Sequence, residues 1–325
     1  MNPVKYHDVD VLVIGSSLEG CIAAIEAANR GKSALLIENN GSLGQAATNG
    51  LNVYIPIKEE NLPGQVQKYV EHILKNAGNA KSKVKTLYHD QLLKVVLQRM
   101  LNEAKVQVLT HVFLANMIFS SGSLTGCRLG TKTGFLDVTA KLVIDATDKM
   151  EAGAAAGLEM IPNSMKVRAG IKFNQVSSEA IRDFADQVIE EQESHLVGKA
   201  KYDLKRTCSG IVLSSGNMAI YHDKEFNELI LNGITAELSD INGIVLSAAQ
   251  AELRKFAYTL RDELRKNVKG FQNAHIINVS PRIECYGMRK AAENPYPNLL
   301  LVNNDVVKYD NLNAIALGVK AGHLD

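Results

Sequence analysis

Three residues near the start of the chain have the types and spacing needed to hold a nucleotide. Gly15 follows an apolar run, Gly20 lies one helical turn further on, and Glu38 ends a second apolar run. A glycine at a strand end allows a tight turn, and a later one lets the helix pack closely against the strand. The amides that begin such a helix favour a pyrophosphate, and an acidic side chain about 20 residues on accepts hydrogen bonds from ribose hydroxyls. The spacing predicts a dinucleotide site.

One position of this turn departs from the usual G-x-G-x-x-G pattern, because Ser17 stands in place of the middle glycine. That glycine normally lets the backbone approach the pyrophosphate, and a Cβ crowds the approach. A serine hydroxyl can itself donate a hydrogen bond to a phosphate oxygen. Two interpretations stay open: a working nucleotide site, or an inherited βαβ unit without a ligand.

Candidates for substrate chemistry lie near the C-terminal end of the chain. Arg282 and Arg289 could bind a substrate carboxylate through their bidentate geometry, and salt bridges between domains are the alternative. His275 has a pKa range suited to proton transfer, although a structural role is more common. His195 and His222 follow polar stretches and are expected in solvent. Neither a Ser-His-Asp set nor a metal cluster can be assembled, so no metal is expected.

The elements that position the first site form a predicted βαβ unit. Residues 9–14 are a short β-branched apolar run, typical of a strand buried on both faces. A helix rich in small residues follows Gly20 and ends at Gly31, and residues 32–38 form the next strand. The segment "GSLGQAATNGLNVYIP" is predicted to be an ordered loop. Further along, the patterns predict helices at 65–76 and 89–104, an antiparallel meander, and a return strand at "KLVIDAT".

From about Arg168 the pattern changes to that of a second, α+β domain. We expect a strand at 169–177, an amphipathic helix at 179–196, two strands within 209–223, and a long amphipathic helix that ends at Gly270. The predicted fold is α/β, with a three-layer Rossmann-like nucleotide-binding domain and this second substrate domain. The predicted bounds are 1–160 with 281–325 for the first domain, and 161–280 for the second.

Composition excludes several classes of function. The 325 residues carry a formal net charge of +1, which argues against nucleic-acid or membrane partners bound through bulk charge. The hydrophobic fraction of 46% is ample for a core. No signal peptide or transmembrane run is visible. The four cysteines are scattered, so a reduced, cytoplasmic setting without disulfides is expected.

Several motifs together resemble one family of flavoproteins. "DVDVLVIGSSLEGCIAAIEAANRGKSALLIE" is similar to the FAD turn of oxidoreductases with a glutathione-reductase-type fold, in the fumarate-reductase-like branch. "GSLGQAATNGLN" resembles the loop beside the flavin, and "AKLVIDATDKMEAGAAAGLEM" resembles the segment along the cofactor. The long helix, the "SPRIECYGMRKA" segment and "NLLLVNNDVV…ALGVKAGHLD" resemble the later parts of the family fold. The resemblance covers most of the chain.

The resemblance implies an FAD-dependent oxidoreductase that acts on a small organic substrate at the interface of the two domains. FAD is the implied cofactor, and the protein's part is to position and tune it. The catalytic residues stay unknown, with Arg282, Arg289 and His275 as candidates. The implied cofactor-binding residues are Gly15, Ser17, Gly20, Glu38, Asn39, Gly44, Gln45, Thr48, Val112, Ala146, Thr147 and Asp305.

The chain departs from the family pattern at four glycines. Ser17, Gln45, Asp148 and Asn304 place side chains where the backbone normally comes close to the cofactor. Asp148 also adds a negative charge near the expected path of the pyrophosphate. The alternative function is therefore a flavoprotein-fold subunit with weak or lost FAD binding that acts as a non-catalytic partner in a complex. A homo-oligomer is also compatible with the sequence.

Overall fold

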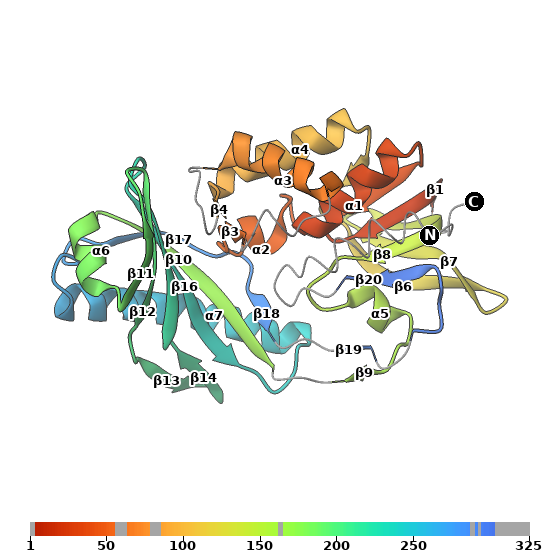
Figure 1. Ribbon diagram of the computed structural model, residues 1–325. Helices are drawn as coiled ribbons and strands as arrows, with labels where there is room; N and C mark the ends of the chain where they lie inside the picture. The colour runs from red at the N-terminus through yellow and green to blue at the C-terminus, as the bar shows by residue number, and fades with distance from the viewer. Residues whose placement is uncertain are drawn as a thin grey trace.

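The chain builds two β-sheets that lie side by side, each flanked by helices (Figure 1). This computed structural model describes residues 4–55, 64–78, 86–161, 165–286, 290–291 and 294–302. The helices are α1 (Leu18–Asn29), α2 (Gln45–Thr48), α3 (Gly64–Ala77), α4 (Asp90–Glu103), α5 (Glu151–Ala155), α6 (Ser178–Phe184) and α7 (Gly243–Asn267).

The first sheet has the strand order β5-β2-β1-β8-β7-β6, with β20 added to β8. Parallel pairing joins β1 to β2 and β8, whereas β6, β7 and β8 form the antiparallel meander that the sequence predicts. These strands are β1 (Val4–Ile14), β2 (Ala34–Ile37), β5 (Gln107–Leu109), β6 (Phe113–Ser120), β7 (Ser123–Thr131), β8 (Gly134–Asp145) and β20 (Leu299–Leu301). Two short antiparallel pairs stand apart, formed by β3 (Tyr54–Ile55) with β4 (Thr86–Leu87) and by β9 (Met160–Ile161) with β19 (Lys290–Ala291).

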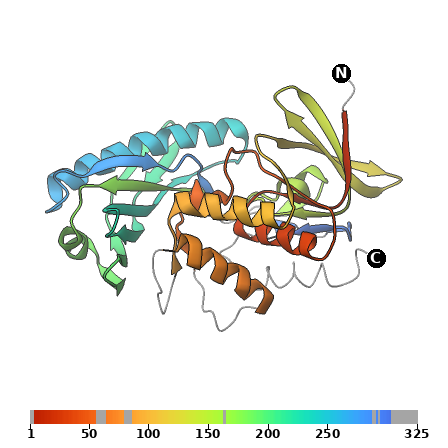
Figure 2. The ribbon, with the colours of Figure 1, turned by 90° about the horizontal axis from the view of Figure 1, so that it is seen from above.

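Alternation along β1 makes the three layers of the first domain. Val11 and Val13 belong to the buried cluster that includes α1, α3 and α4. Leu12 and Ile14 belong to the cluster on the opposite face, with residues of the meander and α5. Successive side chains of a strand point to opposite faces, so a run that is apolar throughout needs cover on both. Figure 2 shows α3 and α4 gathered beside α1.

The second sheet is antiparallel, with the order β11-β12-β15-β16-β10-β17 and with β13, β14 and β18 attached. The helix α7 covers one face of this sheet (Figure 2). Phe256 and Leu260 of α7 are buried in the core between them. The strands are β10 (Lys166–Asn174), β11 (Gln187–Glu191), β12 (His195–Lys201), β13 (Lys205–Cys208), β14 (Ile211–Ser214), β15 (Asn217–Asp223), β16 (Glu228–Glu237), β17 (His275–Val279) and β18 (Glu284–Tyr286).

The other face of the second sheet meets the first domain. Val197, Tyr221 and Ile230 share a buried cluster with the helices of the first sheet. The Lys172 ammonium lies 2.7 Å from carboxylate oxygens of both Asp90 and Glu228, which ties the start of α4 to β10 and β16. The site described below lies along this boundary.

Two expectations of the sequence analysis are wrong. The helix predicted for 179–196 is only α6, because from Gln187 the chain pairs with β12 as the edge strand β11. Backbone pairing with an available strand edge outweighs a local helical preference. His195 and His222 are 1% and 2% exposed instead of lying in solvent.

Other expectations differ in detail or stay predictions. The loop expected after residue 41 contains the single turn α2, and α7 ends at Asn267, three residues before Gly270. The second sheet draws strands from residues 166–286. The domain bounds themselves stay a prediction. Within the part of the chain that the structure describes, no helix is long and apolar enough to cross a membrane.

Replacing Lys172 with Met is expected to lower the free energy of unfolding by about 3 kcal/mol. The reason is that Asp90 and Glu228 would lose their shared cation inside the boundary, where Lys172 is 5% exposed. Lys166→Met is the matched control, since the Lys166–Glu237 pair is exposed on both sides and exposed pairs contribute about 0–1 kcal/mol. Urea unfolding of both variants measures the difference, and equal losses would contradict the assignment.

The contribution of His222 to stability is expected to fall as the pH drops from about 6.5 to about 4. Burial lowers the pKa of His222 from 6.5 to about 4, so in this window the unfolded chain binds a proton that the folded chain does not. The expected slope is about 1.4 kcal/mol per pH unit, with full stability above pH 6.5. Denaturant titrations at several pH values test this against His222→Gln, whose curve should be flatter by that amount. Parallel curves would refute the role of His222.

Candidate functional site

A hollow opens where β1 and β2 end. Open α/β sheets bind ligands at the carboxyl ends of their strands, so this edge is where a ligand is expected. The floor is made by the last residues of the two strands, and side chains from four later segments complete the wall. The lining residues are Ile14, Gly15, Ile37, Glu38, Asn39, Gln45, Val112, Phe113, Leu114, Thr147, Glu151 and Arg282.

The turn after β1 needs both of its glycines. Gly15 has φ +96°, and a Cβ there would lie 2.8 Å from the carbonyl oxygen of Ala146. A Cβ at Gly20 would lie 2.3 Å from the carbonyl oxygen of Gly15 and 2.9 Å from Ala146 Cβ. The first glycine therefore permits the turn, and the second permits the close approach of α1 to the strands.

Ser17 is the N-cap residue of α1. Its Oγ accepts a hydrogen bond from the Gly20 amide at 3.2 Å, a role for which serine is among the preferred residues. Glu19, in the first turn of the same helix, is 7% exposed. Burial raises the pKa of Glu19, against hydrogen bonds from its own amide and from Ser17. The start of α1 is thus satisfied in part by the chain itself.

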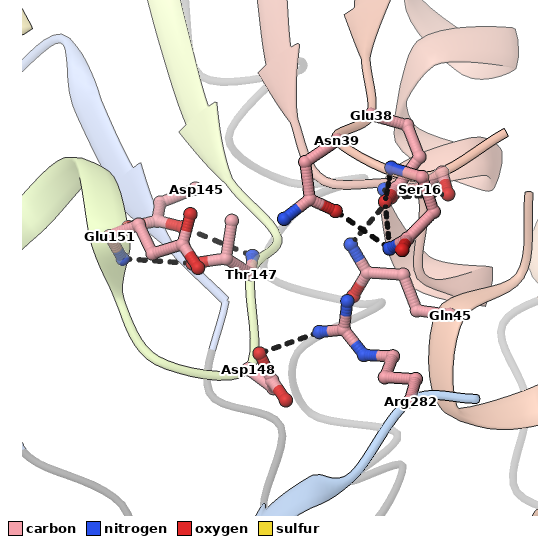
Figure 3. A network of polar contacts seen from close by, with 10 residues as sticks. Ser16, Glu38, Asn39, Gln45, Asp145, Thr147, Asp148, Glu151 and Arg282 are labelled. Atoms are coloured by element: carbon pink, nitrogen blue, oxygen red, sulfur yellow. Dashed lines mark hydrogen bonds and ion pairs between the residues drawn. The ribbon is translucent and has the colours of Figure 1, made fainter. Parts of the chain in front are cut away.

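The carboxylate of Glu38 is the most heavily hydrogen-bonded group at the site (Figure 3). Its Oε2 accepts from the amide and hydroxyl of Ser16, at 3.1 and 2.7 Å, and from Gln45 Nε2 at 2.9 Å. Its Oε1 accepts from the amide and side chain of Asn40, at 2.9 and 2.7 Å. Burial alone would raise the pKa of Glu38, but these hydrogen bonds outweigh it and hold the pKa below its usual value. The group is therefore ionised at neutral pH.

A buried ion pair forms the opposite side of the crevice. Arg282 Nη2 donates to Asp148 Oδ1 at 2.6 Å, and both side chains are about one-tenth exposed. Burial opposes ionisation of Asp148, but the Arg282 and Lys149 charges outweigh it and lower the pKa of the carboxyl. In Figure 3 the side chains of Glu38, Gln45, Arg282 and Asp148 follow one another across the crevice. The pair joins the segment after β8 to the segment before β18.

Asp145 shapes the wall between them. It ends β8 and accepts hydrogen bonds from the amide and hydroxyl of Thr147, at 3.0 and 2.6 Å, and from the amides of Ala152 and Gly153. The Thr147 hydroxyl in turn receives the Glu151 amide at 2.8 Å. A buried carboxylate at the start of α5 therefore fixes the loop that carries Thr147 and Asp148.

Several buried polar atoms at this site have no hydrogen-bond partner among the described residues. They are Gln45 Oε1, Asp148 Oδ2, Arg282 Nε and Glu284 Oε1. Burying a polar group without a partner costs roughly 1–3 kcal/mol. Such atoms are rare in native proteins, and four of them along one boundary indicate that a polar ligand or ordered water belongs there.

The structure brings most of the predicted site residues together. Gly15, Glu38, Asn39, Gln45, Val112, Thr147 and Arg282 line the hollow. Ser17 and Gly20 begin α1, Gly44 and Thr48 flank and end α2, and Ala146 lies against Gly15. His275 is elsewhere, exposed on β17, where its Nδ1 lies 3.3 Å from Arg265 Nη2. Arg289 and Asp305 lie outside the described residues.

The sequence analysis missed Ser16, Asn40 and Glu151. Ser16 is fully buried and supplies two hydrogen bonds to Glu38, and Asn40 supplies two more. The sequence could have indicated both residues, because Ser16 directly follows Gly15 of the turn and Asn40 comes just after the second strand. Glu151 lines the hollow, and burial raises the pKa of its carboxyl. The local sequence does not predict that Glu151 and Gly15 line the same hollow. The two residues come together only because β8, which precedes Glu151, pairs with β1.

Another hollow lies where Val53 and Tyr88 of the first domain meet Tyr221 and Ile230 of the second. His89, Asp90 and Glu228 at its rim hold ligand-type atoms within 4.8 Å of one another. The Lys172 ammonium already takes the place of a cation between the two carboxylates. The expectation that the chain has no metal site stays a prediction.

The fold is similar to those of several solved structures. One is a geranylgeranyl bacteriochlorophyll reductase-like protein from Thermoplasma acidophilum, with a TM-score of 0.63 and 16% identity, covering 97% of this chain and 77% of that one. Another is p-nitrophenol 4-monooxygenase PnpA from Pseudomonas putida, with a TM-score of 0.59 and 14% identity, covering 99% and 81%. Aklavinone-11 hydroxylase, solved with FAD and aklavinone, has a TM-score of 0.56 and 13% identity, covering 97% and 61%. At these identities the likeness establishes the fold alone.

Sequence comparison identifies the family. No curated protein sequence matches the chain. The model of the family described as FAD dependent oxidoreductase matches residues 10–291, which include the turn at Gly15, Glu38, the Asp148 loop and the whole second sheet. The chain therefore belongs to the FAD dependent oxidoreductase family, whose members are enzymes with FAD as cofactor.

Proposed function

We propose that this chain binds FAD along the crevice between Glu38 and Arg282 and oxidises or reduces a small organic substrate at the boundary of the two sheets. The observation that carries the proposal is the hollow at the ends of β1 and β2, where Gly15, the start of α1 and an ionised Glu38 converge. FAD, when bound, supplies the two-electron chemistry, and the protein supplies position and electrostatics.

The residues present fit the adenosine end of the cofactor. Glu38 and Asn39 end the second strand, where they could accept and donate hydrogen bonds to ribose hydroxyls. Val112 lines the same hollow and offers an apolar surface to an adenine ring. The turn at Gly15 and the first amides of α1 lie next to it and suit a pyrophosphate. The unpartnered Arg282 Nε adds a positive donor for the phosphates or for the flavin end.

The substrate is proposed to lie at the boundary of the two sheets. The hollow between Val53, Tyr88, Tyr221 and Ile230 supports this, because both domains contribute to it and its wall mixes aromatic, aliphatic and charged groups. The chain from α2 to Val53 joins this hollow to the crevice. Arg282 as a binder of a substrate carboxylate stays a prediction, and in the structure its partner is Asp148.

Glu38→Gln is expected to weaken FAD binding by about tenfold to a hundredfold, because a charged acceptor of hydrogen bonds is replaced by an amide. Wild-type protein incubated with FAD and passed through gel filtration should keep flavin absorbance that bleaches on anaerobic reduction with dithionite. Titration of FAD fluorescence measures the affinities of both proteins.

Glu71→Gln on the exposed side of α3 is the matched control and should leave the affinity unchanged. Urea unfolding checks that Glu38→Gln is folded. A folded Glu38→Gln variant with wild-type FAD affinity would contradict the assignment of the ribose site. A wild-type protein that retains no flavin at saturating FAD would favour the alternative of a non-catalytic partner subunit.

A further inference from the structure

We infer that Gln45, Asp148 and Arg282 close the crevice beyond its adenosine end, so that FAD enters only when these side chains are displaced. The inference rests on the proposed function and assigns these residues as the ones that set the affinity for the flavin end. Glu38 lines one end of the crevice, and Gln45, Arg282 and Asp148 follow one another from there toward the second sheet (Figure 3).

The backbone of Gln45 is left-handed, a conformation that favours glycine. Its φ is +39°, and it follows Gly44 at +91°, so two successive residues adopt positive φ. A non-glycine residue pays for such a conformation in strain and keeps it only where its surroundings demand it. The Gln45 side chain is 3% exposed and is held by one hydrogen bond to Glu38, while its Oε1 has no partner. The backbone strain and the unpartnered Oε1 both reduce the free energy needed to move Gln45 out of this position.

Gln45 lies over the glycine of the turn. Its Nε2 is 2.9 Å from the point where a Cβ of Gly15 would stand. A glycine at the end of the first strand is the place where a pyrophosphate comes close to the backbone. The amide of Gln45 thus occupies the approach to Gly15 that a phosphate needs, and it does so by bonding to the carboxylate expected to hold the ribose.

The ion pair closes the next stretch of the crevice. Arg282 and Asp148 meet at 2.6 Å from opposite sides, and each retains an unpartnered buried atom, Nε and Oδ2. A buried pair with incomplete hydrogen bonding is weakly stabilising at best. Glu38 and Glu151 also lie near the Arg282 charge. Lys149 lies beside Asp148, and the ionised Asp148 carboxylate opposes a phosphate at this point of the crevice.

Displacement offers Arg282 a better partner. A guanidinium binds phosphate oxygens at least as well as a carboxylate. A ligand that brings phosphates into the crevice can therefore replace Asp148 as the partner of Arg282, whereas adenosine, which carries no phosphate, requires neither Gln45 nor Asp148 to move. The two ligand classes should respond differently to changes at these positions, and this difference is the basis of the test.

The test compares the affinities of FAD and adenosine for the full chain, by titration calorimetry and by quenching of FAD fluorescence. Gln45→Gly should tighten FAD binding by about tenfold or more and leave the affinity for adenosine within about threefold of wild type. Asp148→Asn should tighten FAD binding by a similar factor. Gln175→Gly is the matched control, because Gln175 also has a positive φ, +60°, but is exposed at the end of β10, outside the crevice. It should change neither affinity.

The possible outcomes separate the inference from the proposed function. If Gln45→Gly and Asp148→Asn bind FAD no better than wild type, while wild type does bind it, the inference is overturned and the proposed function stands. Equal gains for FAD and adenosine, or an equal gain in Gln175→Gly, would also overturn it, since relief of strain alone would then explain the effect. If no variant binds FAD although all bind adenosine and unfold cooperatively, the proposed function itself is refuted.

Discussion

The site is organised around one buried carboxylate. Glu38 accepts five hydrogen bonds, from Ser16 after β1, from Asn40 after its own strand and from Gln45 at the start of α2. An ionised group at 2% exposure persists only when such donors surround it. Three segments therefore have to meet at this point for the fold to tolerate the charge. The same requirement places the turn at Gly15, the start of α1 and the α2 loop around one hollow.

This solution has a consequence for binding. The protein's own groups already donate hydrogen bonds to Glu38. The hydroxyls of a bound ribose would have to compete with these donors for the carboxylate. On the Glu38 side of the crevice, the oxygens of the buried carboxylate have hydrogen-bond partners within the protein. Elsewhere along the crevice, one side-chain atom in each of Asp148, Arg282, Gln45 and Glu284 has no partner. The two ends of the crevice therefore differ in hydrogen bonding. At one end the buried polar groups are paired within the protein, and at the other a polar ligand would supply the missing hydrogen bonds.

The second sheet packs against the first domain next to the site. Its face toward the first domain carries Tyr221 and Ile230 into the common core, and Lys172 bridges Asp90 and Glu228 across the boundary. On its other face α7 packs along the sheet and closes the core of the second domain. Because β18, which follows Arg282, pairs with β10, the arginine of the crevice is held beside the second sheet, whereas Glu38 and Asp148 follow strands of the first sheet.

The local pattern of residue types in the sequence predicted the first βαβ unit and the position of the crevice. The period of the apolar residues fixed β1, α1 and β2, and the spacing of Gly15, Gly20 and Glu38 located the crevice, because a turn, a close helix–strand contact and an acidic strand end are all short-range demands. The tertiary structure decided the rest. Edge pairing with β12 turned half of a predicted helix into β11, folding buried His195 and His222, and the meeting of distant segments set Arg282 against Asp148 and Gln45 against Glu38. Those contacts join residues up to 134 positions apart in the sequence, and no local preference encodes which distant partner satisfies a buried charge.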